Sequence, residues 1–209
     1  MERKLLYHIT SYKNLPSILK SGQILAHSLV KDGEFSHSDI AHKRIQDRRS
    51  TTSVNASPFG RLHDYVPFYF APRSPMLYAI KNNRVEGFEG EQSDIIYFVT
   101  DTEKIIQANK KFVFTNGHAI MALTDFYNDL NDLDKIDWDV MENTYWHDTD
   151  EFPDRKWRRQ AEFLVHQTVE LESFLGIGVF NSDMKNRVNN ILQEHKEDMT
   201  VLIKPEFYF

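Results

Sequence analysis

The chain has 209 residues, 41% of them hydrophobic and 13% aromatic, with a formal net charge of −6 and no cysteine. The length and apolar content predict one globular domain with its own core, and the negative charge argues against a general nucleic-acid coat. The lack of cysteine excludes disulfides and cysteine nucleophiles, and without a signal-peptide core or a long apolar run we expect a cytoplasmic protein that spans no membrane.

The first half of the chain alternates strand-like and helix-like patterns. In order, these predict a strand over 5–10, a helix over 14–22, a strand over 23–27, a basic helix over 36–50, a polar loop over 51–63, a strand over 64–72 and a helix over 74–81. Pro16 suits the first turn of the first helix and Gly22 suits its end. Alternation in the first strand places Leu6, His8 and Thr10 on one face. Two polar side chains are therefore expected beside a core leucine.

The second half contains one long segment without a regular pattern. The elements predicted around it are a strand over 94–100, a helix over 101–109, a strand over 111–119, strands over 161–169 and 177–180, a helix over 183–195 and a strand over 200–209. Asn116 and Gly117 predict a tight turn. Residues 119–159 are expected to be helical at first and then irregular, and loops of this length are often lids or binding loops. Together the patterns predict a mixed α+β fold with short strands.

Charged residues are unevenly distributed. Eleven acidic residues and one lysine stand between Asp125 and Asp154. Two basic clusters accompany them, formed by Lys43, Arg44, Arg48 and Arg49 and by Arg155, Lys156, Arg158 and Arg159. Such clusters can bind phosphate groups, or they can be solvated helix faces that pair with the acidic segment. Charge alone leaves these interpretations open.

Common metal and nucleotide motifs are absent. No His-x-x-x-His helix face with an acidic partner occurs, His37 and His42 lack that spacing, and the aspartates form no calcium-loop pattern. The chain also lacks Gly-x-Gly-x-x-Gly, Gly-Lys-Ser/Thr and Gly-x-Ser-x-Gly motifs. The sequence therefore predicts neither metal dependence nor a Rossmann or P-loop nucleotide site.

Glu162 stands at the start of an apolar strand, in the stretch RRQAEFLVHQ. A buried carboxylate is costly unless it is paired or hydrogen-bonded, so Glu162 belongs either to an ion pair with Arg158 or Arg159 or to a site. His8 has the same two interpretations, as a core histidine bonded to a backbone carbonyl or as a site residue. Together with His118 after the expected tight turn, these unusual placements favour a site.

Five segments carry a resemblance to a known family: YHITSYKNLPSIL, RR near residue 48, LHDYVPFYFAPRSPMLYAI, FVFTNGHA and RRQAEFLVH. They occur in order and at plausible spacings from about Tyr7 to the C-terminus. In them the chain resembles the DarT family of DNA ADP-ribosyltransferase toxins. The resemblance implies an ADP-ribosyltransferase-like fold of class α+β, with a bent, split β core, flanking helices and a long substrate loop, in a single domain over residues 1–209.

The resemblance also implies an activity and its partners. DarT-like proteins transfer ADP-ribose from NAD+ to a base in a short motif of single-stranded DNA, and a macrodomain antitoxin of the DarG type removes it. NAD+ is then the co-substrate and no metal is implied. Thymine is the favoured base, because the YVPFYF and PRSPML segments resemble the thymine-modifying branch, and guanine is the second.

Site residues follow from the same resemblance. Glu162 matches the family's catalytic glutamate and Arg49 a second catalytic position. The residues expected to hold NAD+ are His8, Ile9, Thr10, Ser17, Leu25 and Arg49. Residues 35–52 correspond to an NAD+-binding element and 118–162 to a substrate-recognition loop. The candidates for DNA contact in that loop are His118, Tyr145, Trp146, Arg155, Arg158 and Arg159.

Physical chemistry agrees with these assignments. A carboxylate beside the ribose interacts more strongly as positive charge develops on the sugar, so it binds the transition state better than the ground state. An arginine near the diphosphate gives bidentate contacts and can stabilise a deprotonated base nitrogen, although its pKa, above about 12, makes it a poor proton acceptor. Two alternatives stay open: an ADP-ribosyltransferase acting on protein, RNA or water, and a non-catalytic nucleic-acid-binding module. Loop aromatics can stack on bases or pack the loop onto the core.

Overall fold

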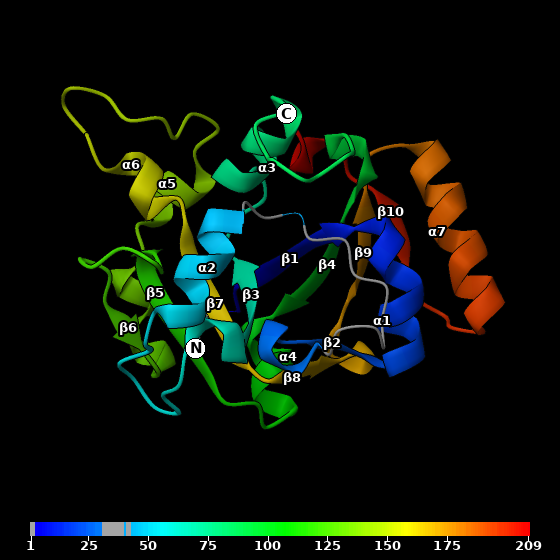
Figure 1. Ribbon diagram of the computed structural model, residues 1–209, viewed down its shortest axis with the longest axis horizontal. Helices are drawn as coiled ribbons and strands as arrows, with labels where there is room; N and C mark the ends of the chain where they lie inside the picture. The colour runs from blue at the N-terminus through cyan, green and yellow to red at the C-terminus, as the bar shows by residue number, and fades with distance from the viewer. Residues whose placement is uncertain (1–2, 31–39, 41–42) are drawn as a thin grey trace.

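A large mixed sheet forms the centre of the protein (Figure 1). The computed structural model describes residues 3–30, 40 and 43–209. The strands, in sheet order, are β10 (Val201–Ile203), β9 (Gly176–Val179), β4 (Ile95–Asp101), β1 (Leu5–Ser11), β3 (Tyr65–Tyr69), β7 (Ala161–His166), β5 (Phe112–His118) and β6 (Phe126–Tyr127). β10 pairs with β9 in parallel, whereas the other neighbours pair antiparallel. A separate two-stranded sheet joins β2 (Gln23–Leu25) to β8 (Thr168–Glu170).

Helices flank this sheet, which confirms the predicted α+β class. They are α1 (Leu15–Ser21), α2 (Lys43–Thr51), α3 (Pro75–Lys81), α4 (Thr102–Gln107), α5 (Trp138–Glu142), α6 (Arg155–Arg158) and α7 (Ser182–His195). The predicted ends of α1 are confirmed, since a proline lies in its first turn and Gly22 ends it in the left-handed region at φ 69°. Of the predicted element over 35–52, residues 35–39 and 41–42 lie outside the described residues, as do His37 and His42.

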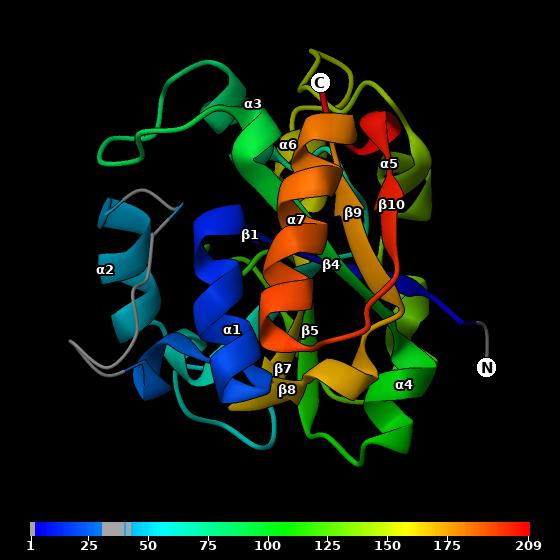
Figure 2. The same ribbon diagram turned by 90° about the vertical axis from the view of Figure 1, so that its right-hand side faces the viewer.

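The two faces of β1 serve different parts of the core. Leu6 is fully buried in the main core, to which α1 and α7 also contribute side chains, and these two helices lie side by side (Figure 2). Tyr7 and Ile9 pack on the opposite face with residues of α3 and of the C-terminal tail. His8 and Thr10 therefore share the face of Leu6, as the alternation predicted. This places two polar side chains beside α1 and β2, where the site described below is found.

The Asn-Gly turn predicted at residues 116 and 117 is wrong. Both residues lie inside β5, at a register irregularity between Phe114 and His118. A Cβ atom on Gly117 would lie 2.1 Å from the ring of Trp157, a distance that no side chain tolerates. Gly117 is thus required for close packing against α6 rather than for a turn.

The segment 119–159 is more ordered than its pattern predicted, and the expectation that it is helical at first is wrong. It begins with turns and β6, and its helical pieces come later, as a 3-10 helix over Leu130–Lys135 followed by α5 and α6. Leu133 and Met141 are buried in the main core and anchor the segment to it. Among the helices of the described chain, we find none with the length and apolar character needed to cross a membrane.

Candidate active site

Glu162 lies in the middle of the sheet and is almost completely buried, at 3% exposure. It is the second residue of β7, directly opposite Tyr69 of β3. Its backbone N–H donates to Oγ1 of Thr115 on the neighbouring strand β5 at 3.0 Å. Strands on both sides therefore fix the position of the Glu162 backbone, which limits how far its carboxylate can move.

An arginine from a distant helix neutralises this carboxylate. Nη1 of Arg49, on α2, donates to Oε2 of Glu162 at 2.7 Å. The backbone N–H of Ala119 donates to Oε1 at 3.4 Å, and Nδ1 of His118 lies 3.6 Å from the same oxygen. The alternative ion pair of Glu162 with Arg158 or Arg159 is wrong.

These neighbours decide the ionisation of Glu162. Burial acts to raise its pKa, but the positive charge of Arg49 and the contact with His118 outweigh burial and hold the pKa at about 2. Tyr69, opposite Glu162, has a raised pKa because it is buried and faces that negative charge. At neutral pH the site therefore holds a carboxylate anion beside a neutral phenol.

The low pKa of Glu162 predicts a specific acid sensitivity. The pKa falls from 4.5 to about 2 on folding, so the ionised pair stabilises the protein fully above pH 4.5 and is lost as the pH falls toward 2. We expect this group to contribute about 3 kcal/mol to the free energy of unfolding above that range. Denaturant unfolding of the wild type and of Glu162→Gln between pH 6 and pH 2 checks this. Parallel curves for the two proteins would contradict the pairing.

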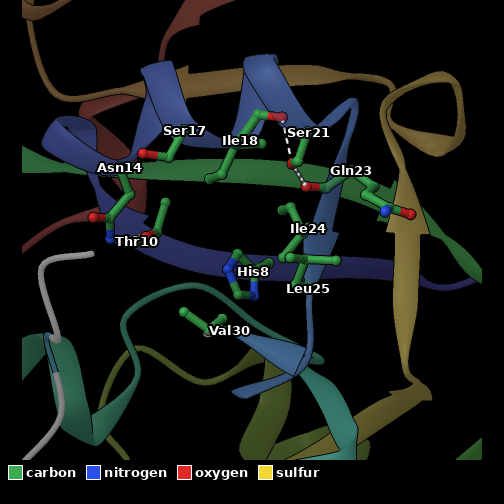
Figure 3. Close-up of a pocket in the computed structure, with 10 residues that line it drawn as sticks. All are labelled: His8, Thr10, Asn14, Ser17, Ile18, Ser21, Gln23, Ile24, Leu25 and Val30. Carbon is green, nitrogen blue, oxygen red and sulfur yellow. Dashed lines mark hydrogen bonds between the residues drawn. The ribbon is translucent and has the colours of Figure 1, made fainter. Parts of the chain in front are cut away.

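Glu162 and Arg49 line a cavity of about 160 Å³. A second cavity, of about 90 Å³, adjoins it and is lined by α1, β1 and β2 (Figure 3). The two share four lining residues: His8, Thr10, Leu25 and Val30. In Figure 3 the ring of His8 lies between the side chains of α1 and Val30. The two cavities thus lie side by side between α1 and Glu162, and together they are called the cleft below.

His8 makes the backbone bond that one interpretation of its sequence position predicted, and its place at the cavities is compatible with the other. Its Nδ1 lies 2.8 Å from the carbonyl oxygen of Pro67. A carbonyl can only accept, so Nδ1 carries the proton in this contact. The ring also lines both cavities. The bond to β3 thus fixes the orientation of a ring that faces the cleft.

One nitrogen of the Arg49 guanidinium can still donate hydrogen bonds to a ligand. Its Nη2 is buried and has no hydrogen-bond partner within the described part of the chain. Buried polar atoms nearly always have a partner, so an unpartnered guanidinium nitrogen on a residue that lines a cavity is suited to an anionic ligand. The neighbouring Arg48 instead donates to the carbonyl oxygen of Ile120 at 2.9 Å and ties α2 to the segment after β5.

The structure brings most of the predicted site residues together. Those that line the larger cavity are His8, Ile9, Thr10, Leu25, Arg49, His118 and Glu162, and Ser17 lines the smaller one. The sequence interpretation missed Tyr65, Pro67 and Tyr69 of β3, which line the larger cavity as well. Their spacing of two along the predicted strand placed them on one face and could have identified them.

The predicted DNA-contact residues are more dispersed. Tyr145 is 73% exposed, whereas Trp146 is buried at 8% and packs against the rings of Tyr78 and Phe209. An aromatic platform needs an accessible face, so the expectation for Trp146 is not met.

The arginines among these predicted residues bind carbonyl and carboxylate groups of the protein itself. Arg159 is 4% exposed and bonds backbone carbonyls, so its expected contact with DNA is not met either. Arg158 pairs with Asp137 and Asp154, as the alternative of pairing with the acidic segment proposed. Arg155 donates to the carbonyl oxygen of Tyr145 at 2.7 Å.

The described residues hold no group of three or more histidine, aspartate or glutamate side chains arranged to bind a metal ion. What the cleft does contain is an anionic carboxylate, a guanidinium with a spare donor and an oriented imidazole. This set can stabilise a developing positive charge and bind an anion side by side.

Known proteins are similar to this chain in sequence and in structure. A DNA ADP-ribosyl transferase from Thermus sp. (strain 2.9) is 37% identical over 206 residues, which cover 98% of this chain and 95% of the relative. The structure of Thermus sp. 2.9 DarT in complex with ADP-ribosylated ssDNA superposes with a TM-score of 0.91 at 35% identity, covering 99% of this chain and 96% of that chain. The same protein in complex with NAD+ gives a TM-score of 0.86 at 33% identity, covering 99% and 98%.

A longer relative and a family description complete the comparison. A DNA ADP-ribosyl transferase-DNA ADP-ribosyl glycohydrolase fusion protein from Thermosipho africanus is 27% identical over 212 residues, covering 98% of this chain and 49% of the fusion. A sequence model of DarT, described as ssDNA thymidine ADP-ribosyltransferase, matches residues 7–209. With a family match over nearly its whole length and a relative at 37% identity, the chain belongs to the DarT family of single-stranded DNA ADP-ribosyltransferases.

Proposed function

We propose that this chain transfers ADP-ribose from NAD+ to a thymine base in a short motif of single-stranded DNA. The observation that carries the proposal is the buried Glu162 carboxylate, kept ionised by Arg49 at the wall of the cleft. The description of the family as ssDNA thymidine ADP-ribosyltransferase and the NAD+ complex of the Thermus protein support the substrate pair. A non-catalytic binding module would have no use for a desolvated anion in this position.

NAD+ fits the cleft by the chemistry of its walls. The spare Nη2 of Arg49 is suited to a diphosphate oxygen. His8, Thr10, Ser17 and Leu25 give the rest of the cleft a mixed polar and apolar lining, as a dinucleotide with rings and hydroxyls requires. We assign the described helix α2 to the NAD+-binding element, because it carries Arg49 to the cleft.

Glu162 stabilises the transition state of the reaction. Breaking the bond between nicotinamide and ribose builds positive charge on the sugar, and a fixed carboxylate stabilises that charge as it forms. Because the surrounding strands hold the carboxylate in place and exclude water, little reorganisation is needed at the moment of reaction. The low pKa keeps Glu162 anionic throughout the physiological range.

Arg49 connects the two substrates. We assign it to holding the diphosphate and to stabilising the base nitrogen as that nitrogen loses its proton. Nη1 of Arg49 lies 2.7 Å from Oε2 of Glu162, so this one contact fixes the positions of the two charges relative to each other. An arginine is a poor proton acceptor, so Arg49 assists by stabilising the base anion, and the proton itself leaves to solvent.

Residues 118–162 are proposed as the substrate-recognition loop. The turns after β5 expose Met121 at 37% and Leu123 at 60%, two and four residues beyond Ala119, whose N–H contacts Glu162. Tyr145 is exposed further along the same loop. The acidic residues of this segment repel phosphate, so we expect DNA to be held locally at a short motif rather than along an extended track.

A toxin role and an antitoxin partner follow from the fused relative. In Thermosipho africanus a transferase and a DNA ADP-ribosyl glycohydrolase are joined in one protein. We infer that this chain is likewise paired with a glycohydrolase, a macrodomain antitoxin of the DarG type, and that it acts in the cytoplasm, where NAD+ and single-stranded DNA meet. Coexpression with such a partner should relieve toxicity.

A single assay tests the proposed activity. We expect incubation with NAD+ and a random-sequence single-stranded DNA library to yield, after digestion to nucleosides, thymidine with the added mass of one ADP-ribose. The same library annealed to its complement and the Glu162→Gln variant serve as controls and should give little product. A guanosine adduct would replace thymine by guanine as the target. ADP-ribose found only on protein, only on RNA or only free in solution would overturn the DNA assignment.

A further inference from the structure

The side chains of the basic stretch Arg155–Arg159 differ in exposure: Lys156 is exposed, Arg155 and Arg158 are half-buried, and Arg159 is buried. Arg159, three residues before Glu162, is the most buried of its side chains at 4% exposure. Within the described part of the chain no carboxylate pairs with it, and burial and the nearby Arg73 lower its pKa to about 10. It therefore stays cationic at neutral pH, and backbone oxygens must compensate its charge.

The guanidinium of Arg159 bonds two separate segments. Nη1 donates to the carbonyl oxygens of Val140, Met141 and Asn143 at 2.7, 2.6 and 3.2 Å. These belong to the last turn of α5 and the residue after it, where carbonyls lack partners within the helix. On its other side, Nη2 donates to the carbonyl oxygen of Pro72 at 2.6 Å. One side chain thus caps α5 and fixes the turn between β3 and α3.

Neighbouring residues of the same stretch hold the beginning of the loop. Nε1 of Trp157 donates to Oγ1 of Thr124 at 3.0 Å, and that hydroxyl donates to the carbonyl oxygen of His118 at 2.7 Å. The Trp157 ring also lies against Gly117. Arg158 reaches Asp137, the residue that caps the start of α5. The stretch therefore contacts both the turns that follow β5 and the two ends of α5.

We propose that Arg159 is a positioning residue for DNA ADP-ribosylation, which holds α5 and the Pro72 turn in register with the strand that carries Glu162. It acts on substrate only through these segments. The Pro72 turn leads into α3, whose Met76 lines the larger cavity, and α5 lies in the proposed substrate-recognition loop. The inference rests on the proposed function, since it concerns how the second substrate is aligned with the first.

Arginine is required here because of its geometry. The carbonyls of α5 and of Pro72 are reached by different nitrogens of one rigid, planar group. A lysine carries the same charge at a single point and cannot bond both segments in this way. A methionine fills similar space with no donor at all. These two replacements separate the charge of Arg159 from its double contact.

The test compares Arg159→Lys and Arg159→Met with Arg84→Met, which removes an exposed arginine outside the cleft and outside residues 118–162. We expect Arg159→Lys to lower kcat for transfer to single-stranded DNA about tenfold or more, because misalignment by about 1 Å can cost up to 100-fold, and Arg159→Met to lower it further. NAD+ affinity, measured by calorimetric titration, should stay within about twofold of the wild type. Arg84→Met should transfer normally.

Hydrogen exchange adds a readout that a general loss of stability would not give. In Arg159→Lys we expect faster exchange in residues 137–147 and unchanged exchange in β1 and β4. The inference is overturned if both Arg159 variants transfer at the wild-type rate, if NAD+ binding falls in parallel with transfer, or if Arg84→Met loses as much activity as Arg159→Lys. Failure of the wild type itself to modify DNA would refute the proposed function instead.

Discussion

Replacing Glu162 by glutamine is expected to lower kcat for ADP-ribose transfer by at least about 10²–10³-fold, the usual effect of removing one preorganised electrostatic group. The amide of glutamine has nearly the same shape, and its single oxygen can still accept from Arg49, whereas its NH2 group replaces the oxygen that accepts from Ala119. We expect the fold and NAD+ binding to persist. What is lost is the negative charge that stabilises the sugar cation. Single-turnover transfer to DNA, together with NAD+ titration, measures the two quantities separately.

Glu172→Gln is the matched control for this prediction. Glu172 is exposed and lies outside the cleft, so the change removes the same charge without touching the site. We expect its transfer rate to equal that of the wild type. Normal transfer by Glu162→Gln would refute the role of the carboxylate, and a parallel loss of NAD+ binding would make Glu162 a binding group only.

Replacing Arg49 by alanine should reduce turnover more than NAD+ binding. The change leaves Glu162 buried without its cation, so burial, which raises the pKa of Glu162, loses its main opposition. We therefore expect kcat to fall about 100-fold at neutral pH, and the acid side of the pH–rate profile to move toward neutral pH. Initial rates between pH 5 and pH 9, with NAD+ affinity measured at each pH, give both results.

Two further variants sharpen the Arg49 prediction. Arg49→Lys keeps the charge and should keep the acid side of the profile near its wild-type position, although it cannot hold the diphosphate in a bidentate manner. Arg44→Ala removes an exposed arginine from the same helix and should leave both rate and profile unchanged. Equal losses of turnover and NAD+ binding in Arg49→Ala, with no change in pH profile, would reduce Arg49 to a phosphate contact.

Local patterns predicted the elements of the fold well, for reasons that are visible in the structure. The left-handed Gly22 ends α1, and Ser74 begins α3 by accepting from the backbone N–H of Leu77. Both signals depend only on neighbours in the chain. The Asn-Gly turn failed because Trp157, forty residues away, lies over Gly117 and needs a residue without a side chain.

Some predictions of DNA-contact residues failed for the same reason, because they depend on residues far away in the chain. A run of arginines and an aromatic pair in a long loop is a reasonable signature of a nucleic-acid surface. In the folded protein, Arg158 pairs with a carboxylate of the loop, Arg159 donates to its backbone carbonyls, and Trp146 is buried. Composition cannot distinguish these outcomes, because the partners are set by the path of the loop.

The sequence by itself determined the order of strands and helices, the family to which the chain belongs, and Glu162 as the carboxylate of interest. Only the tertiary structure decided that the partner of Glu162 is Arg49, which stands 113 residues earlier, and that Arg159 faces inward. Periodicity and capping act over a few neighbouring residues and are readable from sequence. The pairing of two buried charges depends on which strands and helices meet in space, and sequence patterns do not specify that.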